Sequence, residues 1–128
     1  MRLLADTHVL LWALNAPDRL SKDAREALID EENAVSISVV SLWEIAIKIS
    51  IGRLQLAPDW LNMIEDGRRA LGAHWLQLET AHCERVASLS WHHRDPFDRM
   101  LAAQAACEGL TLISRDGVLA AYPAPVLW

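Results

Sequence analysis

Short apolar runs alternate along the chain with longer stretches in which apolar residues recur at helical spacing. The runs at residues 2–5, 34–37, 74–78 and 110–114 have the length of strands, and a last short strand is expected near Val126. Strands that alternate with helices are typical of a parallel sheet with helices on both faces. The pattern therefore predicts an α/β fold with three layers, α/β/α, around a central, mostly parallel sheet.

Residues that commonly begin or end helices mark the segments between these strands. Ser21, Ser38 and Thr80 are expected N-caps, and Pro96 suits the first position of a helix. Gly109 suits the position just past a helix end, where the backbone turns left-handed. The predicted helices span residues 7–14, 21–30, 38–50, 58–72, 80–89 and 96–108, with one more short helix in the tail.

The composition indicates one folded domain, expected over residues 1–128, because no repeat or linker-like stretch divides the chain. No apolar run approaches the roughly 20 residues that a membrane span needs, and the start does not resemble a signal peptide. Cys83 and Cys107 are isolated and form no CxxC pair. A cytoplasmic protein with free thiols and no membrane association is expected.

The formal net charge of -5 argues against a protein that simply coats nucleic acid. Non-specific binding to phosphates draws on Lys and Arg. A site for divalent cations must be locally acidic, however, and the cations then carry the positive charge. The acidity of the chain is therefore compatible with a metal-dependent enzyme that acts on RNA.

Two acids follow predicted strands directly. Asp6 ends the first strand, and Asp116 comes shortly after the strand at residues 110–114. In parallel sheets, ligands bind beyond the carboxyl ends of the strands, where both acids are expected. For either residue alone, a turn residue or a helix cap is the preferred interpretation.

Glu44 lies in a strongly apolar predicted helix and has two interpretations. It could pair with Lys48 one turn later on a solvent-facing surface, which would contribute only a few tenths of a kcal/mol. Helical spacing also places Ser41 beside Glu44, so that this polar stripe could instead face a metal site. The periodicity does not decide between water and a cleft.

Asp98 and Asp95 lie at the start of the helix that Pro96 begins. A carboxylate in the first turn of a helix favours the positive end of its dipole, which gives Asp98 a structural explanation. Asp95 has another, as the expected N-cap. Asp98 is the better ligand candidate, because its side chain can project from the helix start into the same cleft as the other acids.

Four carboxylates at one edge would repel each other unless cations bind among them. Mg²⁺ (or Mn²⁺) is the expected cofactor, because hard divalent ions prefer carboxylate oxygen. Two such ions, roughly 3.5–4 Å apart, could activate water for an in-line displacement at phosphorus. Zinc is disfavoured, because the set contains no Cys or His.

The four acids lie in four motifs of the sequence. The motifs are LLADTH at residues 3–8 with LLW at 10–12, SLWEIAIK at 41–48 with GRL at 52–54, DPFDRMLAAQA at 95–105, and LTLISRD at 110–116. In content and order they resemble the motifs of PIN-domain proteins of the VapC toxin type. The resemblance extends over nearly the whole chain.

This resemblance implies a PIN fold and divalent-metal-dependent cleavage of RNA as one half of a toxin–antitoxin pair. By position it implies four metal-binding, catalytic acids: Asp6, Glu44, Asp98 and Asp116. Ser114, Thr7 and Asp95 would support them. It further implies a homodimer and a cognate VapB-type antitoxin whose tail can fill the cleft.

Several basic residues stand next to the acids in the sequence. Arg94, Arg99 and Arg115 could bind RNA phosphates or form ion pairs that orient the carboxylates, and for Arg99 the ion pair is the favoured interpretation. His92 and His93 are expected to be loop residues, because no Cys or further His stands at a spacing that would complete a metal site.

Other functions remain open at this point. A haloacid-dehalogenase-like phosphatase would need a second Asp where the chain has His8. A receiver domain would need a second acid close to Asp6 and a late Lys, and neither is evident. A ribonuclease-H-like nuclease would begin with a hairpin meander, whereas a helix is expected after the first strand here. A PIN domain that only binds RNA or protein, and a free-standing ribonuclease without an antitoxin, are the remaining alternatives.

Overall fold

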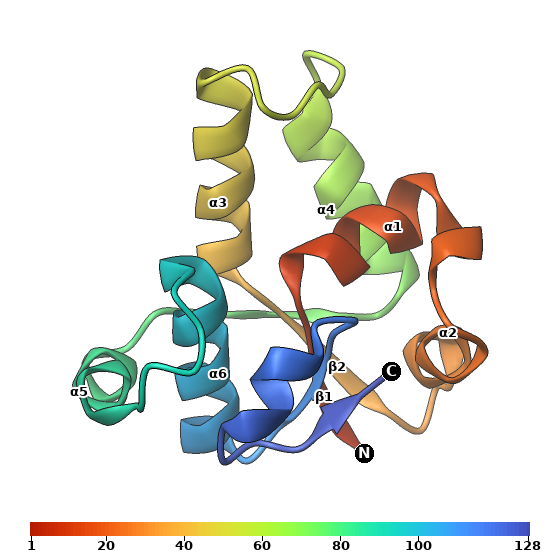
Figure 1. The fold of residues 1–128 in the computed structure, drawn as a ribbon. Coiled ribbons are helices and arrows are strands. Elements are labelled where there is room, and N and C mark those ends of the chain that lie inside the picture. Colours follow the sequence, from red (N-terminus) through yellow and green to blue (C-terminus); the bar gives the residue numbers. More distant parts are fainter.

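A five-stranded sheet forms the centre of the computed structural model, which describes residues 1–128 (Figure 1). All strand pairings are parallel, in the order β3-β2-β1-β4-β5. The strands are β1 (Arg2–Ala5), β2 (Ala34–Ser38), β3 (His74–Leu76), β4 (Thr111–Ile113) and β5 (Val126–Leu127). The predicted parallel α/β sheet is confirmed, although β3 and β4 are shorter than expected.

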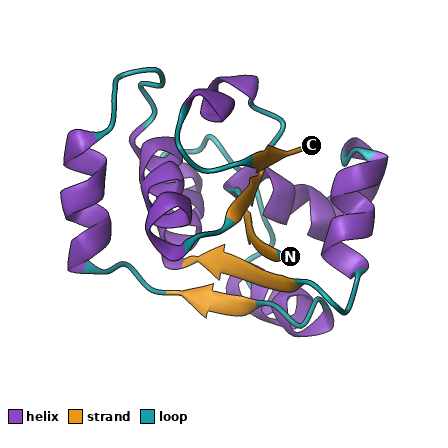
Figure 2. Cartoon of the chain, turned by 90° about the horizontal axis from the view of Figure 1, so that it is seen from below, coloured by secondary structure: helices purple, strands orange, loops and turns teal.

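Helices cover both faces of this sheet, as Figure 2 shows. They are α1 (Thr7–Asn15), α2 (Lys22–Ile29), α3 (Val39–Ser50), α4 (Trp60–Ala70), α5 (Thr80–Ser88) and α6 (Pro96–Glu108), with the 3-10 turns η1 (Pro17–Arg19) and η2 (Gly117–Ala121). None of these helices has the length and apolar character needed to cross a membrane. The three-layer architecture expected from the sequence is therefore confirmed.

Two apolar cores lie on the two faces of the sheet. Leu3 and Ala5 of β1 pack into the core that includes residues of α1, α2 and α4. Leu4, between them, packs into the core that includes residues of α6. Successive residues of a strand point to opposite faces, so a strand buried on both faces is apolar throughout.

The helix ends mostly follow the expected signals. Ser21 accepts a hydrogen bond from the Ala24 amide, and Ser38 accepts one from the Val40 amide. Gly109 ends α6 with a φ of 66°, where glycine avoids the cost of a Cβ. The expected cap at Thr80 is wrong: α5 is capped by Glu79, whose backbone amide donates to Nδ1 of the buried His82.

Candidate active site at the carboxyl edge of the sheet

Three of the four predicted acids line one cavity of about 240 Å³, called here the acid cavity. Asp6 follows β1, Asp116 follows β4, and Asp98 projects from the first turn of α6. The other lining residues are His8, Trp12 and Arg115. The carboxyl edge of the sheet thus brings together acids that are up to 110 positions apart in the sequence.

The Asp6 side chain is fixed at this edge by a hydrogen bond to the backbone. Its Oδ1 accepts a hydrogen bond of 2.8 Å from the Val9 amide, so the residue also caps α1. Only 4% of Asp6 is exposed. Burial raises the pKa of the Asp6 carboxyl above 3.8, against the opposing effects of the Ser114 hydroxyl and the Val9 amide. The cap and the cavity interpretations therefore both apply to this one side chain.

Asp98 carries the clearest sign of accumulated negative charge. Burial, followed by the charges of Asp95, Glu44 and Asp6, raises the pKa of its carboxyl from 3.8 to about 7, while His93 opposes the rise. A carboxyl in such surroundings holds a proton near neutral pH unless a cation takes its place. The acid cavity therefore has an excess of negative charge that the chain itself does not neutralise.

Glu44 is buried beside the acid cavity and is not among its lining residues. Thr7 Oγ1 lies 2.6 Å from Glu44 Oε1 and 2.9 Å from Ser41 Oγ. Since a carboxylate only accepts, the Thr7 hydroxyl donates to Glu44 and accepts from Ser41. Lys48 pairs with the other carboxylate oxygen, Oε2. The polar stripe of α3 therefore faces inward, and Glu44 is only 2% exposed.

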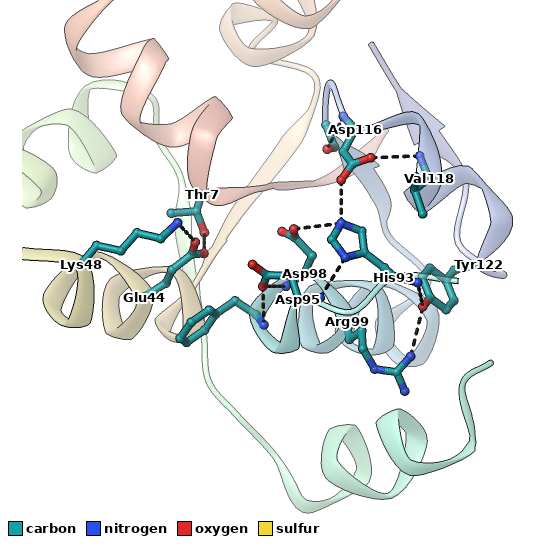
Figure 3. Close-up of polar contacts among 12 residues, drawn as sticks. Thr7, Glu44, Lys48, His93, Asp95, Asp98, Arg99, Asp116, Val118 and Tyr122 are labelled. Atoms are coloured by element: carbon teal, nitrogen blue, oxygen red, sulfur yellow. Dashed lines mark hydrogen bonds and ion pairs between the residues drawn. The ribbon is translucent and has the colours of Figure 1, made fainter. Parts of the chain in front are cut away.

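His93 is the residue of this site that sequence reasoning misses. Its Nε2 lies 2.7 Å from Asp116 Oδ2 and 3.3 Å from Asp98 Oδ2, so that the ring stands between these two acids in Figure 3. Its Nδ1 accepts a hydrogen bond of 3.0 Å from the Asp95 amide. Nε2 must then carry the ring proton and donate it to the carboxylates. Only the position of His93 two residues before Asp95 could have signalled this role.

Two supporting residues hold the acids through the backbone. Asp95 Oδ1 accepts from the amides of Phe97 and Asp98 at 2.8 and 3.1 Å, which confirms it as the N-cap of α6. Ser114 is buried, and its Oγ accepts from the Asp116 amide at 3.0 Å. These contacts fix the segments that carry Asp98 and Asp116.

Arg99 corrects a prediction, because it contacts none of the acids. It is 4% exposed, and its guanidinium donates to the carbonyls of Ser90, Val86 and Leu89 and to the Tyr122 hydroxyl. Helical geometry turns neighbouring residues to different sides, so Asp98 faces the cavity while Arg99 faces α5. A buried arginine with these partners neither binds RNA phosphate nor orients a carboxylate.

The other two predicted arginines lie on the surface. Arg115 is exposed at the rim of the acid cavity. Arg94 is also exposed, but it lines a different, apolar cavity together with Trp43 and Trp91. Of the three arginines, only Arg115 therefore stands beside the acids.

The donor chemistry of the acid cavity fits a hard divalent cation. Asp6, Asp98 and Asp116 offer three carboxylates, and Arg115 is the one Arg or Lys that lines the cavity with them. Nε2 of His93 is close enough to Asp98 and Asp116 to belong to such a group. The expectation that no histidine lies among the acids is therefore wrong. As placed, however, Nε2 of His93 donates a proton, so the atoms available to bind a cation are the carboxylate oxygens.

The family assignment rests on matches over nearly the whole chain. The family model of the PIN domain matches residues 3–125. Ribonuclease VapC22 of Mycobacterium tuberculosis is 32% identical over 129 residues, covering 97% of this chain and 95% of that protein. The chain is a PIN-domain protein of the VapC type.

Solved structures agree with this PIN fold. VapBC2 of Rickettsia felis, bound to a promoter DNA fragment, has a similar chain with a TM-score of 0.76 at 13% identity, covering 99% of this chain and 98% of that one. DNA-bound VapBC of Salmonella typhimurium gives a TM-score of 0.73 at 17% identity, covering 99% and 97%. At these identities the likeness establishes the shared fold.

Proposed function

We propose that this PIN-domain protein is a divalent-metal-dependent endoribonuclease that acts as the toxin of a toxin–antitoxin pair. The observation that carries the proposal is the acid cavity, in which Asp6, Asp98 and Asp116 converge and the pKa of Asp98 rises to about 7. A relative of 32% identity is named a ribonuclease. Hydrolysis of RNA phosphodiester bonds is the reaction that is consistent with both observations.

Mg²⁺ or Mn²⁺ would be held by Asp6, Asp98 and Asp116, with Glu44 as a fourth acid beside them. A bound divalent cation supplies Lewis acidity toward the phosphate and lowers the pKa of water to give a nucleophile. The remaining work belongs to the chain. Thr7 and Lys48 fix the Glu44 carboxylate, and Ser114 and Asp95 fix the backbone around Asp116 and Asp98.

Arg115 is the basic residue best placed to bind a phosphate of the substrate, because its exposed guanidinium stands at the rim of the acid cavity. Arg94 is a second candidate for RNA contact from the neighbouring loop. His93 links Asp98 and Asp116 through Nε2, so its ring would compete with a cation for one oxygen of each acid.

The partners are proposed from the relatives. The similar chains of Rickettsia felis and Salmonella typhimurium come from VapBC complexes. We propose a cognate VapB-type antitoxin, a homodimer and a cytoplasmic location for this protein as well. A small DNA-binding protein encoded immediately next to this chain would support the toxin role, and its absence would favour a free-standing ribonuclease.

Cleavage of total cellular RNA by the purified chain tests the activity, with Mg²⁺ or Mn²⁺, with EDTA, and with an Asp6→Asn variant. Asn is as good an N-cap as Asp, so this variant keeps the cap of α1 while it removes the carboxylate charge. Discrete metal-dependent products that disappear in the variant are expected. Equal cleavage by the variant would refute the carboxylate mechanism. A folded wild type that cuts nothing with any metal would leave a binding module in its place.

A further inference from the structure

A second cavity, of about 370 Å³, adjoins the acid cavity and shares His8 and Trp12 with it. Its lining residues come from α1, from Ala16 and Arg19 after it, and from Lys48 of α3 and the segment that follows α3. Three of its lining residues are basic, namely Arg19, Lys48 and Arg53, and none is acidic. We call this cavity the basic groove.

The basic groove stands out against the overall charge of the chain. The chain has 17 acidic and 12 basic side chains, yet the groove gathers three basic residues without one acid. Arg19 and Arg53 are exposed, and neither forms a salt bridge. Arg19 instead places its guanidinium 4.8 Å from the centre of the Trp12 ring. Two arginines are therefore available to an outside anion.

Lys48 connects the basic groove to the candidate active site. Its ammonium pairs with the buried Glu44 carboxylate beside the acid cavity, and its side chain is 32% exposed along the groove. A chain of negative groups that extends from the acid cavity into this groove would therefore meet Lys48, Arg19 and Arg53. A nucleic-acid strand carries negative phosphates at regular intervals and can reach both cavities, whereas a small phosphate ester is too short to do so.

We propose that the basic groove binds the RNA strand on one side of the scissile phosphate, with backbone phosphates on Arg19 and Arg53. This inference rests on the proposed function, because the acid cavity supplies the place of the scissile bond. RNA is favoured over an acidic protein segment, because the groove shares His8 and Trp12 with the cavity proposed to receive the phosphodiester. Contacts of this kind read charge and not base sequence.

The test compares Arg19→Gln/Arg53→Gln with a control, Arg2→Gln/Arg69→Gln, in the cleavage-deficient Asp6→Asn protein. Arg2 begins β1 and Arg69 precedes β3, so the control removes two exposed arginines from the opposite, amino edge of the sheet. Anisotropy of a labelled single-stranded RNA 12-mer in Mg²⁺ gives the dissociation constant at a series of NaCl concentrations.

The groove variant should bind about tenfold more weakly than its parent, and its salt slope should fall by about 0.7 for each lost phosphate contact. The control should keep the affinity within about twofold and the slope unchanged. Equal losses in both variants, or an unchanged slope in the groove variant, would overturn the proposal, and the groove would then serve another partner such as an acidic protein segment.

A second measurement separates this proposal from the proposed function. With Asp6 restored, hydrolysis of bis(p-nitrophenyl) phosphate reports on the acid cavity without any RNA strand in the groove. The groove variant should hydrolyse this ester at the wild-type rate and cut RNA with a raised KM. Groove-dependent RNA binding by a wild type that hydrolyses neither substrate would overturn the nuclease and keep the groove. Wild-type cleavage of RNA that is indifferent to Arg19 and Arg53 would do the reverse.

Discussion

Two histidines of this chain are held in the same way but face different numbers of carboxylates. In His82 and in His93, Nδ1 accepts a backbone amide at 3.0 Å, from Glu79 and from Asp95 respectively. Nε2 of His82 lies 2.8 Å from Glu108 alone. Nε2 of His93 lies between Asp116 and Asp98. These two acids line the acid cavity together with Asp6.

A buried polar group by itself therefore does not mark a functional site. Around His82 one ring donor meets one carboxylate, and the nearby Gln104 is bound by the Ser38 hydroxyl at 2.6 Å. Around His93 the carboxylates outnumber the donors, and the pKa of Asp98 is raised. Several carboxylates gathered in one cavity, and not the burial of a single polar group, are what point to a missing cation.

The largest expected effect is the difference in RNA cleavage between variants of Asp98 and of Glu108. Asp98→Asn should lower RNA cleavage by at least about 1000-fold, because it removes an acid proposed to hold the cation. Glu108→Gln also removes one negative charge, but it keeps an oxygen that accepts from His82. Its cleavage rate, measured with the same RNA, should stay near wild type. Similar losses in both variants would contradict the distinction between the two regions.

The next effect concerns Arg99, which follows Asp98 in the sequence but serves only the fold. Arg99→Met should lower the free energy of unfolding by about 3 kcal/mol, because it leaves buried carbonyls without a donor. Urea denaturation measures this loss. Cleavage per folded molecule should fall far less than in Asp98→Asn. A stable variant without activity would instead place Arg99 in the catalytic machinery.

A smaller effect is expected in the pH dependence of stability without metal. The pKa of Asp98 is raised to about 7, so the folded state binds this proton more tightly than the unfolded chain, whose carboxyl titrates near 3.8. The free energy of unfolding should therefore fall as the pH rises through this interval, by about 1–3 kcal/mol after allowance for solvent screening.

The control for this pH effect is Asp98→Asn, unfolded with urea in EDTA. The variant should be more stable than wild type near pH 8, and the difference should vanish as the pH falls below about 3, under both pKa values of Asp98. A constant difference across this range would show that the side chain acts through packing and not through its charge.

The smallest effect should come from His93→Ala. Because Nε2 donates to Asp98 and Asp116, the ring competes with a cation for their oxygens. Its removal should tighten Mn²⁺ binding by about threefold, the order of one hydrogen bond. Weaker Mn²⁺ binding in the variant would contradict this and mean that the His93 ring changes its tautomer or orientation and becomes a ligand of the cation.

The order of strands and helices could be predicted from the sequence, because each buried strand is a short apolar run and most helix ends carry a local signal. Asp6 and Asp116 could be placed at one edge because parallel strands end on the same side. Glu44 could not be assigned to a buried or an exposed face, since periodicity gives the spacing of a stripe but not what covers it.

His93 and Arg99 were beyond sequence reasoning for a physical reason. The contact between His93 and Asp116 spans 23 positions and depends on how the loop before α6 folds back. The contacts of Arg99 run to the end of α5 and to Tyr122. Both are set by tertiary packing, which leaves no local pattern in the sequence.

Calorimetric titration with Mn²⁺ tests the central claim most directly, that the acid cavity holds a divalent cation which neutralises its surplus charge. Wild type and Glu108→Gln should bind the ion with the same affinity. Asp98→Asn should bind it at least about 100-fold more weakly while remaining as well folded as wild type in EDTA. If Asp98→Asn binds as tightly as wild type, the ion lies elsewhere and the acid cavity is not the metal site.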